Sequence, residues 1–236
     1  MQPNAFSVNS ALRPQVFYLG QEATPLIVID DFSADVAACR QAAQQADFQV
    51  DAKAYYPGIK APLPKDYVAA TLTALYPLLY DVYKVPTQLR LKPHNLFYAL
   101  INNTEQQLKP LQCIPHFDTT SPSYIAILHY LNEQPHGSTG FFRHIPTGFE
   151  RINEQRRQPY FEKAQQHIDQ YGSPEQQYFV QTDHHYQLYH QVAYQANRLI
   201  IYPGNALHST LVDKLTDIDS SPVSGRLTAN LFVDFL

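Results

Sequence analysis

The sequence has no tryptophan, only one methionine, and only two cysteines and eight glycines in 236 residues. Cys39 and Cys113 lie far apart and form no CxxC motif, so we expect two buried thiols in a reducing compartment. No zinc-binding pattern, phosphate-binding loop or Ser/His/Asp order stands out.

Long apolar runs and clusters of basic residues are also missing. No apolar stretch approaches the roughly 18 residues of a membrane span, and the first residues lack the charged-then-apolar pattern of a signal peptide. The formal net charge is −4, and no group of Lys and Arg could follow a phosphate backbone. These absences predict a cytoplasmic protein with neither nucleic acid nor membrane as its partner.

What the sequence does contain fits a globular domain. Hydrophobic residues make up 44% and charged residues 16% of the chain, enough for one sizeable core. Its aromatic content consists of 17 Tyr and 13 Phe. Tyrosine combines an apolar ring with a polar tip, and therefore suits half-buried strands and the walls of a polar pocket.

The first third of the chain has a mixed α/β pattern. Leu26–Ile29 is typical of a buried strand, and residues 34–46 of a helix with Ser33 as its N-cap. Residues 55–59 indicate a turn. Residues 65–83 show the apolar periodicity of a second helix. We therefore expect residues 1–88 to form an α/β extension that packs on the rest of the chain.

From Leu89 onward, short strand-like runs alternate with turns, as in a sandwich or barrel. The runs are residues 96–101, 124–131, 199–202 and 227–235. An insertion at about 149–197 interrupts them and contains a helical stretch from Arg151 to Tyr171, with Gly172 as its stop. The insertion could be a lid over a site or a structural buttress, and the sequence leaves both open.

The most specific local pattern is His116-Phe117-Asp118. Positions two apart on an extended chain point the same way, so His116 and Asp118 can present an imidazole and a carboxylate to one point. His208 follows a strongly apolar run and is placed to supply a third ligand. Two His and one carboxylate form a facial triad that leaves open positions on Fe(II). An HxD pair alone is more often a surface feature.

Arg226 opens the last apolar run, and Thr228 points along the same face. A buried arginine is costly without a partner, and its planar fork matches a carboxylate. Arg226 and Thr228 together therefore indicate a carboxylate site. The alternative is an arginine that faces solvent at the start of a strand.

In this order, the residues resemble the 2-oxoglutarate/Fe(II) oxygenase superfamily, nearest its prolyl-4-hydroxylase-like branch. The resemblance covers residues 89–236. It includes the HxD motif, the later His208 and the basic Arg226. Three further stretches match, namely 124–132 ending in Tyr-Leu-Asn, 137–142 with its Thr and Phe, and the run 198–203 that leads to His208.

The resemblance implies an α+β chain with a double-stranded β-helix (jelly-roll) core at residues 89–236, N-terminal helices and a helical insertion. It further implies catalytic metal ligands His116, Asp118 and His208, Fe(II) as cofactor, and 2-oxoglutarate as co-substrate. The carboxylate of 2-oxoglutarate would meet Arg226, with Tyr130 and Thr228 beside it. Tyr98 is a weaker candidate for the pocket wall.

One departure from the family pattern and two rival functions accompany this interpretation. Arg226 follows His208 by 18 residues, longer than the family spacing, and we expect the excess at 213–224 to be a surface insertion. The rivals are a jelly-roll module that binds a ligand without turnover, and a cupin-like metal enzyme without 2-oxoglutarate. The sequence identifies neither the substrate, a small molecule or a protein side chain, nor the oligomeric state. His184, His185 and His190 do not have the spacing of a second metal site.

Overall fold

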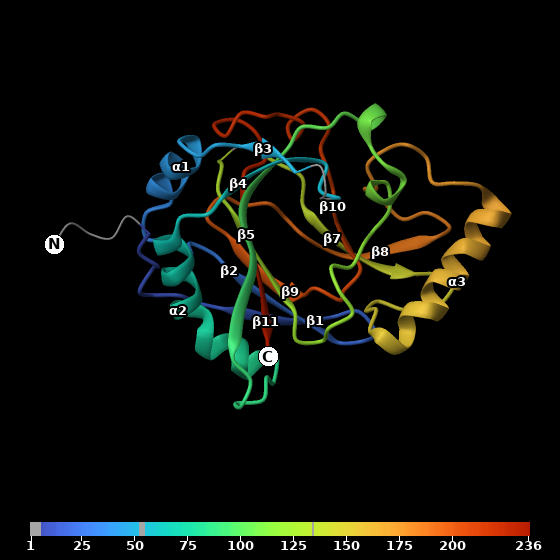
Figure 1. The fold of residues 1–236 in the computed structure, drawn as a ribbon, viewed down its shortest axis with the longest axis horizontal. Coiled ribbons are helices and arrows are strands. Elements are labelled where there is room, and N and C mark those ends of the chain that lie inside the picture. Colours follow the sequence, from blue (N-terminus) through green and yellow to red (C-terminus); the bar gives the residue numbers. More distant parts are fainter. Residues whose placement is uncertain (1–5, 52–54, 134) are drawn as a thin grey trace.

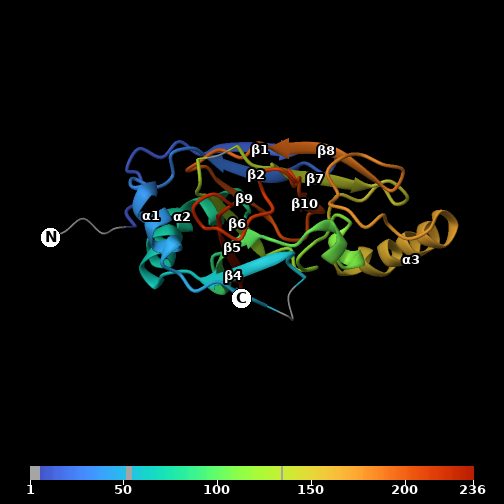
Figure 2. The same ribbon diagram turned by 90° about the horizontal axis from the view of Figure 1, so that it is seen from above.

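The computed structural model describes residues 6–51, 55–133 and 135–236. It is a mixed α/β structure with mostly antiparallel strands and few helices, in which two sheets face each other (Figures 1 and 2). Its strands are β1 Gln15–Leu19, β2 Thr24–Ile29, β3 Gln49–Val50, β4 Gly58–Pro62, β5 Leu91–Ile101, β6 Ile125–Tyr130, β7 Thr139–His144, β8 Tyr186–Val192, β9 Leu199–Pro203, β10 His208–Thr210 and β11 Thr228–Phe235. Its helices are α1 Val36–Gln44, α2 Lys65–Val82 and α3 Glu154–Tyr171, with short 3-10 turns at Glu105–Gln107 and Pro110–Gln112.

The larger sheet has the strand order β1-β2-β9-β6-β11-β5-β4-β3, with every neighbouring pair antiparallel. Its centre, β9-β6-β11-β5, is made from the runs that the sequence predicts as strands. The N-terminal part of the chain adds two strands at each edge of this sheet. Residues before 89 therefore extend the sheet itself and also supply the helices that cover it.

The smaller sheet has the order β10-β7-β8, also antiparallel. An antiparallel bridge between His116 and His208 adds the 116–118 segment alongside β10. Strands β7, β8 and β10 were not expected as strands, because their short runs carry polar residues such as Arg143, Gln187 and Ser209.

Helices α1 and α2 cover the outer face of the larger sheet, at the side of the molecule opposite α3 (Figure 2). The predicted bounds of α2 are confirmed to within one residue, and Pro77 lies inside it. Ser33 is not the N-cap of α1. Asp35 holds that position, and its side chain accepts a hydrogen bond from the Ala38 amide at 2.9 Å. Aspartate is at least as good a cap as serine, which explains the shift of two residues.

The alternation of side chains gives the larger sheet two distinct faces. Leu227, Ala229 and Leu231 of the β11 region pack into the core between the sheet and the helices. The intervening residues Arg226 and Thr228 belong to the opposite, inner face, which looks toward the smaller sheet. This parity decides which polar side chains of the central strands can reach a site between the sheets.

None of the helices in the described part of the chain combines the length and the apolarity needed to cross a bilayer.

Helix α3, inside the insertion, begins after Asn153, whose side chain accepts a hydrogen bond from the Arg156 amide. It ends at Gly172, which has a φ of +92°. That φ lies in the left-handed region that glycine tolerates. The predicted stop at Gly172 is thus confirmed, although the helix starts three residues later than expected.

Glu150 ties this insertion to the β1–β2 turn. Its fully buried carboxylate accepts hydrogen bonds from the amides of Gln21 and Glu22, both at 3.0 Å, and from Arg143. We expect Glu150→Ala to lower the free energy of unfolding by about 3 kcal/mol, because two amides and a guanidinium lose their buried acceptor.

Chemical denaturation measures this effect, with Glu162→Ala as the matched control. Glu162 is exposed on α3 and bonds only Gln158, so its loss should change the free energy by less than about 0.5 kcal/mol. Equal effects of the two substitutions would contradict the role given to Glu150.

Candidate metal centre

The backbone brings His116, Asp118 and His208 together. His116 and His208 exchange a pair of backbone hydrogen bonds, with N···O distances of 2.9 and 2.8 Å. Two residues further, the Asp118 amide donates to the Gly204 carbonyl at 2.7 Å. The HxD segment is therefore fixed on both sides to the turn that carries the distal histidine.

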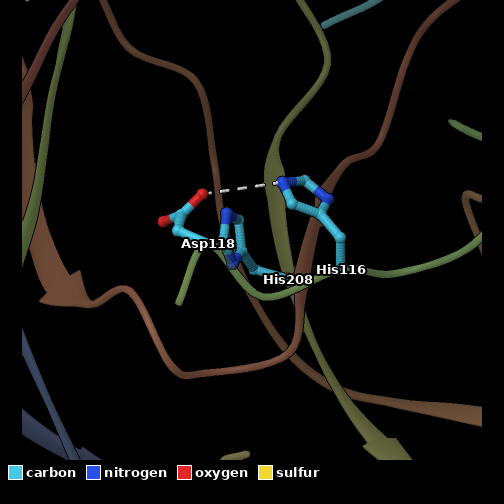
Figure 3. A group of neighbouring side chains, drawn as sticks. All are labelled: His116, Asp118 and His208. Atoms are coloured by element: carbon cyan, nitrogen blue, oxygen red, sulfur yellow. Dashed lines mark ion pairs between the residues drawn. The ribbon is translucent and has the colours of Figure 1, made fainter. Parts of the chain in front are cut away.

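The three side chains point toward one another (Figure 3). Their potential ligand atoms all lie within 4.8 Å of one another, and His116 Nε2 lies 4.0 Å from Asp118 Oδ1. In the described part of the chain, no other three His, Cys, Asp or Glu side chains meet so closely. Since metal–ligand distances are about 2.0–2.2 Å, small side-chain rotations would close the triad around one ion.

The protonation states suit a metal ion. Burial lowers the pKa of His208 to about 4, against a hydrogen bond to the Ala206 carbonyl that raises it. The His116 side chain is 53% exposed, and partial desolvation by neighbouring atoms lowers its pKa to about 4, with nearby His208 also lowering it. Both imidazoles are therefore neutral at pH 7, with lone pairs free to bind a metal.

Two further contacts orient the ligands. His208 Nδ1 lies 2.9 Å from the Ala206 carbonyl, so Nδ1 carries the proton and Nε2 is left to bind. Burial raises the pKa of Asp118 to about 6, with His116 opposing the rise, so that the carboxyl is mainly ionised at neutral pH. The donor set is two imidazole nitrogens and one carboxylate oxygen.

Helix α3 supports this segment from outside. The Phe117 ring, between the two ligands of the HxD motif, packs edge-on against Tyr160 at 5.8 Å and near Phe161 at 6.2 Å. Thr120 donates a hydrogen bond to Glu154 at the start of the helix. The insertion thus contacts the metal-ligand segment itself and lies away from the N-terminal helices.

A second polar group lies on the inner face of the larger sheet. Arg226 is 1% exposed and donates from Nε to the Gly137 carbonyl at 2.9 Å, while its Nη2 has no hydrogen-bond partner. The guanidinium lies over the rings of Tyr130 and Tyr194, at 5.5 and 5.6 Å. A buried, partly unsatisfied guanidinium requires an anion.

Tyr202 connects the two polar groups. Its ring lies 4.9 Å from that of His208, in an edge-on arrangement. Burial raises the pKa of its hydroxyl well above the usual value, Asp118 and Tyr130 raise it further, and Arg226 lowers it. Tyr202 packs against His208 and belongs to the same buried cluster as Tyr130, over which Arg226 lies, so the triad and Arg226 lie on the same side of the larger sheet.

Of the other expected residues, Tyr130 and Thr228 lie on this inner face and Tyr98 does not. Tyr130 and Thr228 are directly opposite each other in register, and the Tyr130 hydroxyl lies 2.7 Å from the Thr139 hydroxyl. Tyr98 is opposite Ala229 and packs into the core beneath α2. Strand parity therefore turns Tyr98 away from the metal, and its assignment to the pocket wall is corrected.

The loop at 213–224 is only partly the expected surface insertion. Leu215 is 94% exposed, but Asp217 is fully buried and accepts from His136 Nδ1 at 3.0 Å and from the Gly137 amide. Burial raises the pKa of Asp217, but the His136 hydrogen bond, the charge of Arg226 and backbone amides outweigh it and lower the pKa. Asp217 is therefore a carboxylate that helps to hold Arg226 in place.

Tyr56 also comes under the charge of Arg226, although its sequence context indicates only a turn. Its hydroxyl is buried without a hydrogen-bond partner. Burial raises its pKa above the usual range, while the charge of Arg226 lowers it and that of Asp217 raises it. Tyr56 Oη and Arg226 Nη2 are thus two buried groups without a hydrogen-bond partner, and the charge of Arg226 acts on Tyr56. No local pattern in the sequence could have indicated this interaction.

The remaining histidines form no second triad. His144 and His185 place their Nε2 atoms 3.0 Å apart, and the ring of His167 stacks on that of His185 at 3.9 Å. His190 lies in β8, away from this contact. The stacked rings fill the space between α3 and the smaller sheet.

Comparisons with known proteins give a family and a set of distant structural likenesses. A model of a family of unknown function, DUF6445, matches residues 10–233. No curated protein matches the chain.

Among solved structures, the chain is similar to two of HygX from Streptomyces hygroscopicus. One has nickel and 2-oxoglutarate bound, and the other has nickel, 2-oxoglutarate and hygromycin B bound. Both show 14% identity, a TM-score of 0.49, and coverage of 89% of this chain and 83% of HygX. An N-substituted L-amino acid dioxygenase from Burkholderia ambifaria gives 10% identity, a TM-score of 0.39, and coverage of 92% and 83%. At this degree of similarity, an assignment of function depends on the residues of the chain itself.

Proposed function

We propose that this chain, which belongs to the DUF6445 family of unknown function, is an oxygenase that uses Fe(II) and 2-oxoglutarate to hydroxylate its substrate. One observation carries the proposal. Arg226 is buried with an unpaired Nη2, and the cluster that contains Tyr130 and Tyr202 connects it to a His/Asp/His triad, because Arg226 lies over Tyr130 and Tyr202 packs on His208. Neither a simple metal site nor a simple anion site accounts for both groups.

The strand order supports the proposal. The four central strands of the larger sheet run β5-β11-β6-β9, and opposite them the 116–118 segment pairs with β10, followed by β7 and β8. Two facing four-stranded antiparallel layers linked in this way have the connectivity of a jelly-roll. In such a fold the triad lies between the layers, where a small ligand can be enclosed.

The residues fit the cofactor and co-substrate. Two neutral imidazoles and a carboxylate suit Fe(II), and a facial triad leaves coordination positions for ligands that are not protein side chains. 2-Oxoglutarate has two carboxylates, and the one remote from the metal would occupy the position at Arg226 Nη2 and Tyr56 Oη. Thr228 and the Tyr130–Thr139 hydroxyl pair border that position.

The proposed reaction converts a substrate C–H, 2-oxoglutarate and dioxygen into the C–OH product, succinate and carbon dioxide. Iron, when bound, supplies the activation of dioxygen. The chain itself would hold the metal through its triad and neutralise the remote carboxylate with Arg226, which lies over the rings of Tyr130 and Tyr194. Asp217 accepts from the Gly137 amide, and the Gly137 carbonyl in turn accepts from Arg226 Nε.

The proposal is tested by following 2-oxoglutarate in air. The iron-loaded protein should form succinate slowly even without substrate, and omission of Fe(II) should abolish that formation. A protein that binds iron but neither binds 2-oxoglutarate nor forms succinate would refute the proposal and favour the cupin-like rival. Binding of 2-oxoglutarate without turnover under any condition would favour the ligand-binding rival.

Tyr56 gives a more local prediction. We expect Tyr56→Phe to weaken 2-oxoglutarate binding about tenfold, because one hydroxyl donor to a carboxylate is lost. Calorimetry on zinc-loaded protein without oxygen measures this. Tyr55→Phe, an exposed neighbour, is the matched control and should bind like the wild type. Unchanged affinity in Tyr56→Phe would remove Tyr56 from the co-substrate site.

A further inference from the structure

A row of aromatic rings begins beside the metal centre and has no role in the functions assigned above. Its first member is Tyr124, which precedes β6. A Cβ atom added to Gly204 would lie 2.7 Å from Tyr124 Cδ1 and 3.0 Å from Asp118 Oδ2. The Tyr124 ring and the Asp118 carboxylate therefore flank the same glycine, and the row starts next to a metal ligand.

The row continues across two neighbouring strands of the larger sheet. Tyr124 stacks with Phe232 of β11 at 5.8 Å and an interplanar angle of 26°, and Phe232 stacks with Phe97 of β5 at 5.8 Å and 28°. All three residues are partly exposed. Rings stacked on one another in this way form a continuous apolar row, along which an extended ligand body can pack.

A cation lies at the far end of the row. Lys60 Nζ lies 4.3 Å from the centre of the Phe97 ring and 5.6 Å from that of Tyr56. Lys60 on β4 pairs with Ala99 on β5, and Ala99 pairs with Thr228 on β11. The three side chains therefore lie in one row across the strands and share the inner face of the sheet. Lys60 is thus two strands away from Thr228, and its contact with the Tyr56 ring places it beside the position proposed for the remote carboxylate of 2-oxoglutarate.

The ammonium group of Lys60 is poorly satisfied. Its side chain is 19% exposed, and the nearest carboxylate oxygen, Asp51 Oδ2, is 3.9 Å away, beyond hydrogen-bond distance. Burial lowers the pKa of Lys60, and Asp51 partly opposes this. A half-buried ammonium whose nearest carboxylate oxygen lies 3.9 Å away is stabilised when an anion comes closer to it.

We propose that this row binds the substrate, and that the substrate is a carboxylic acid with an aromatic or extended apolar body. The body lies on the rings of Tyr124, Phe232 and Phe97, the carboxylate meets Lys60, and the carbon to be oxidised lies near Tyr124 and the metal. A cationic substrate would be repelled by Lys60, and a neutral one would bury it without a partner. This inference rests on the proposed function, because it names the substrate class of that site.

The test uses ω-phenylalkanoates with chains of two to six carbons and the matching neutral amides as probes. They are titrated by calorimetry into zinc-loaded protein that is saturated with 2-oxoglutarate, which occupies the metal and Arg226. The best acid should bind at least about tenfold more tightly than its amide, as expected for one charge-assisted hydrogen bond.

Four variants test which residues cause that preference. Lys60→Gln should abolish it by weakening the acid about tenfold and leaving the amide unchanged, and Lys60→Arg should restore it. Lys65→Gln is the control, since Lys65 is exposed at the start of α2. Phe97→Leu should weaken acid and amide alike, because both rest on the same ring.

The outcomes separate this inference from the proposed function. If 2-oxoglutarate binds but amides match the acids in every chain length, or Lys60→Gln leaves the acid affinity unchanged, the substrate class is overturned and the oxygenase proposal stands. If 2-oxoglutarate does not bind, the oxygenase proposal fails. The titration is then repeated without it, and a Lys60-dependent preference for acids would keep the row as a binding site.

Discussion

Arg226→Ala should lower the affinity of the metal-loaded protein for 2-oxoglutarate by about a hundredfold or more and leave its affinity for the metal nearly unchanged. The physical reason is that a buried carboxylate loses its charged, two-pronged partner. Asp217 makes the loss larger, because without the guanidinium a second buried carboxylate lies close to the co-substrate position.

Calorimetry without oxygen measures this effect, and two variants make it specific. Arg226→Lys keeps the charge but not the fork, so its affinity should be intermediate. Arg198→Ala removes another arginine of the larger sheet, one that pairs with Asp30 at 2.6 Å outside the enclosure. It should reduce stability and leave 2-oxoglutarate affinity intact. Wild-type affinity in Arg226→Ala would remove the anchor and revive the cupin-like rival.

Asp118→Ala should abolish tight metal binding and with it all turnover. Removal of a residue that only hydrogen-bonds a metal ligand already lowers metal affinity about 10–100-fold, and removal of a ligand itself should lower it more. The metal-free protein should fold normally, because the Asp118 carboxylate is desolvated, with its pKa raised to about 6, and supplies no hydrogen bond to the fold. Its removal relieves a buried charge.

Thermal unfolding with and without metal checks this prediction. Zinc should raise the Tm of the wild type by mass action and leave that of Asp118→Ala unchanged. Asp234→Ala is the control, since Asp234 lies near Tyr124 but outside the triad, and its Tm should respond to zinc like that of the wild type. An equal response of Asp118→Ala would show that the metal binds elsewhere.

The sequence predicts the central strands and the triad because their signals are local. The runs that become β6, β9 and β11 are continuously apolar, and the two-residue spacing of His116 and Asp118 fixes their common direction. His208 and Arg226 follow from their position in the order of a resembling family. Each of these inferences needs only neighbouring residues or a familiar sequence of features.

The errors come from long-range register. Tyr98 and Tyr130 are both strand tyrosines, and only the pairing with Ala229 and Thr228 shows which face each one occupies. Tyr56, which precedes the strand β4, comes under the charge of Arg226, just before β11. Asp217 is buried because its polar loop closes over Gly137. No periodicity within a short window contains this information.

The central claim is that one enclosure holds a metal ion and 2-oxoglutarate together. Its most direct measurement is the visible absorption of the Fe(II)-loaded protein as 2-oxoglutarate is added without oxygen. We predict a charge-transfer band that saturates at one equivalent of 2-oxoglutarate. The band should be lost in Asp118→Ala and should require far more 2-oxoglutarate in Arg226→Ala. Fe(II) that binds to the triad while 2-oxoglutarate produces no band and no binding heat would contradict it.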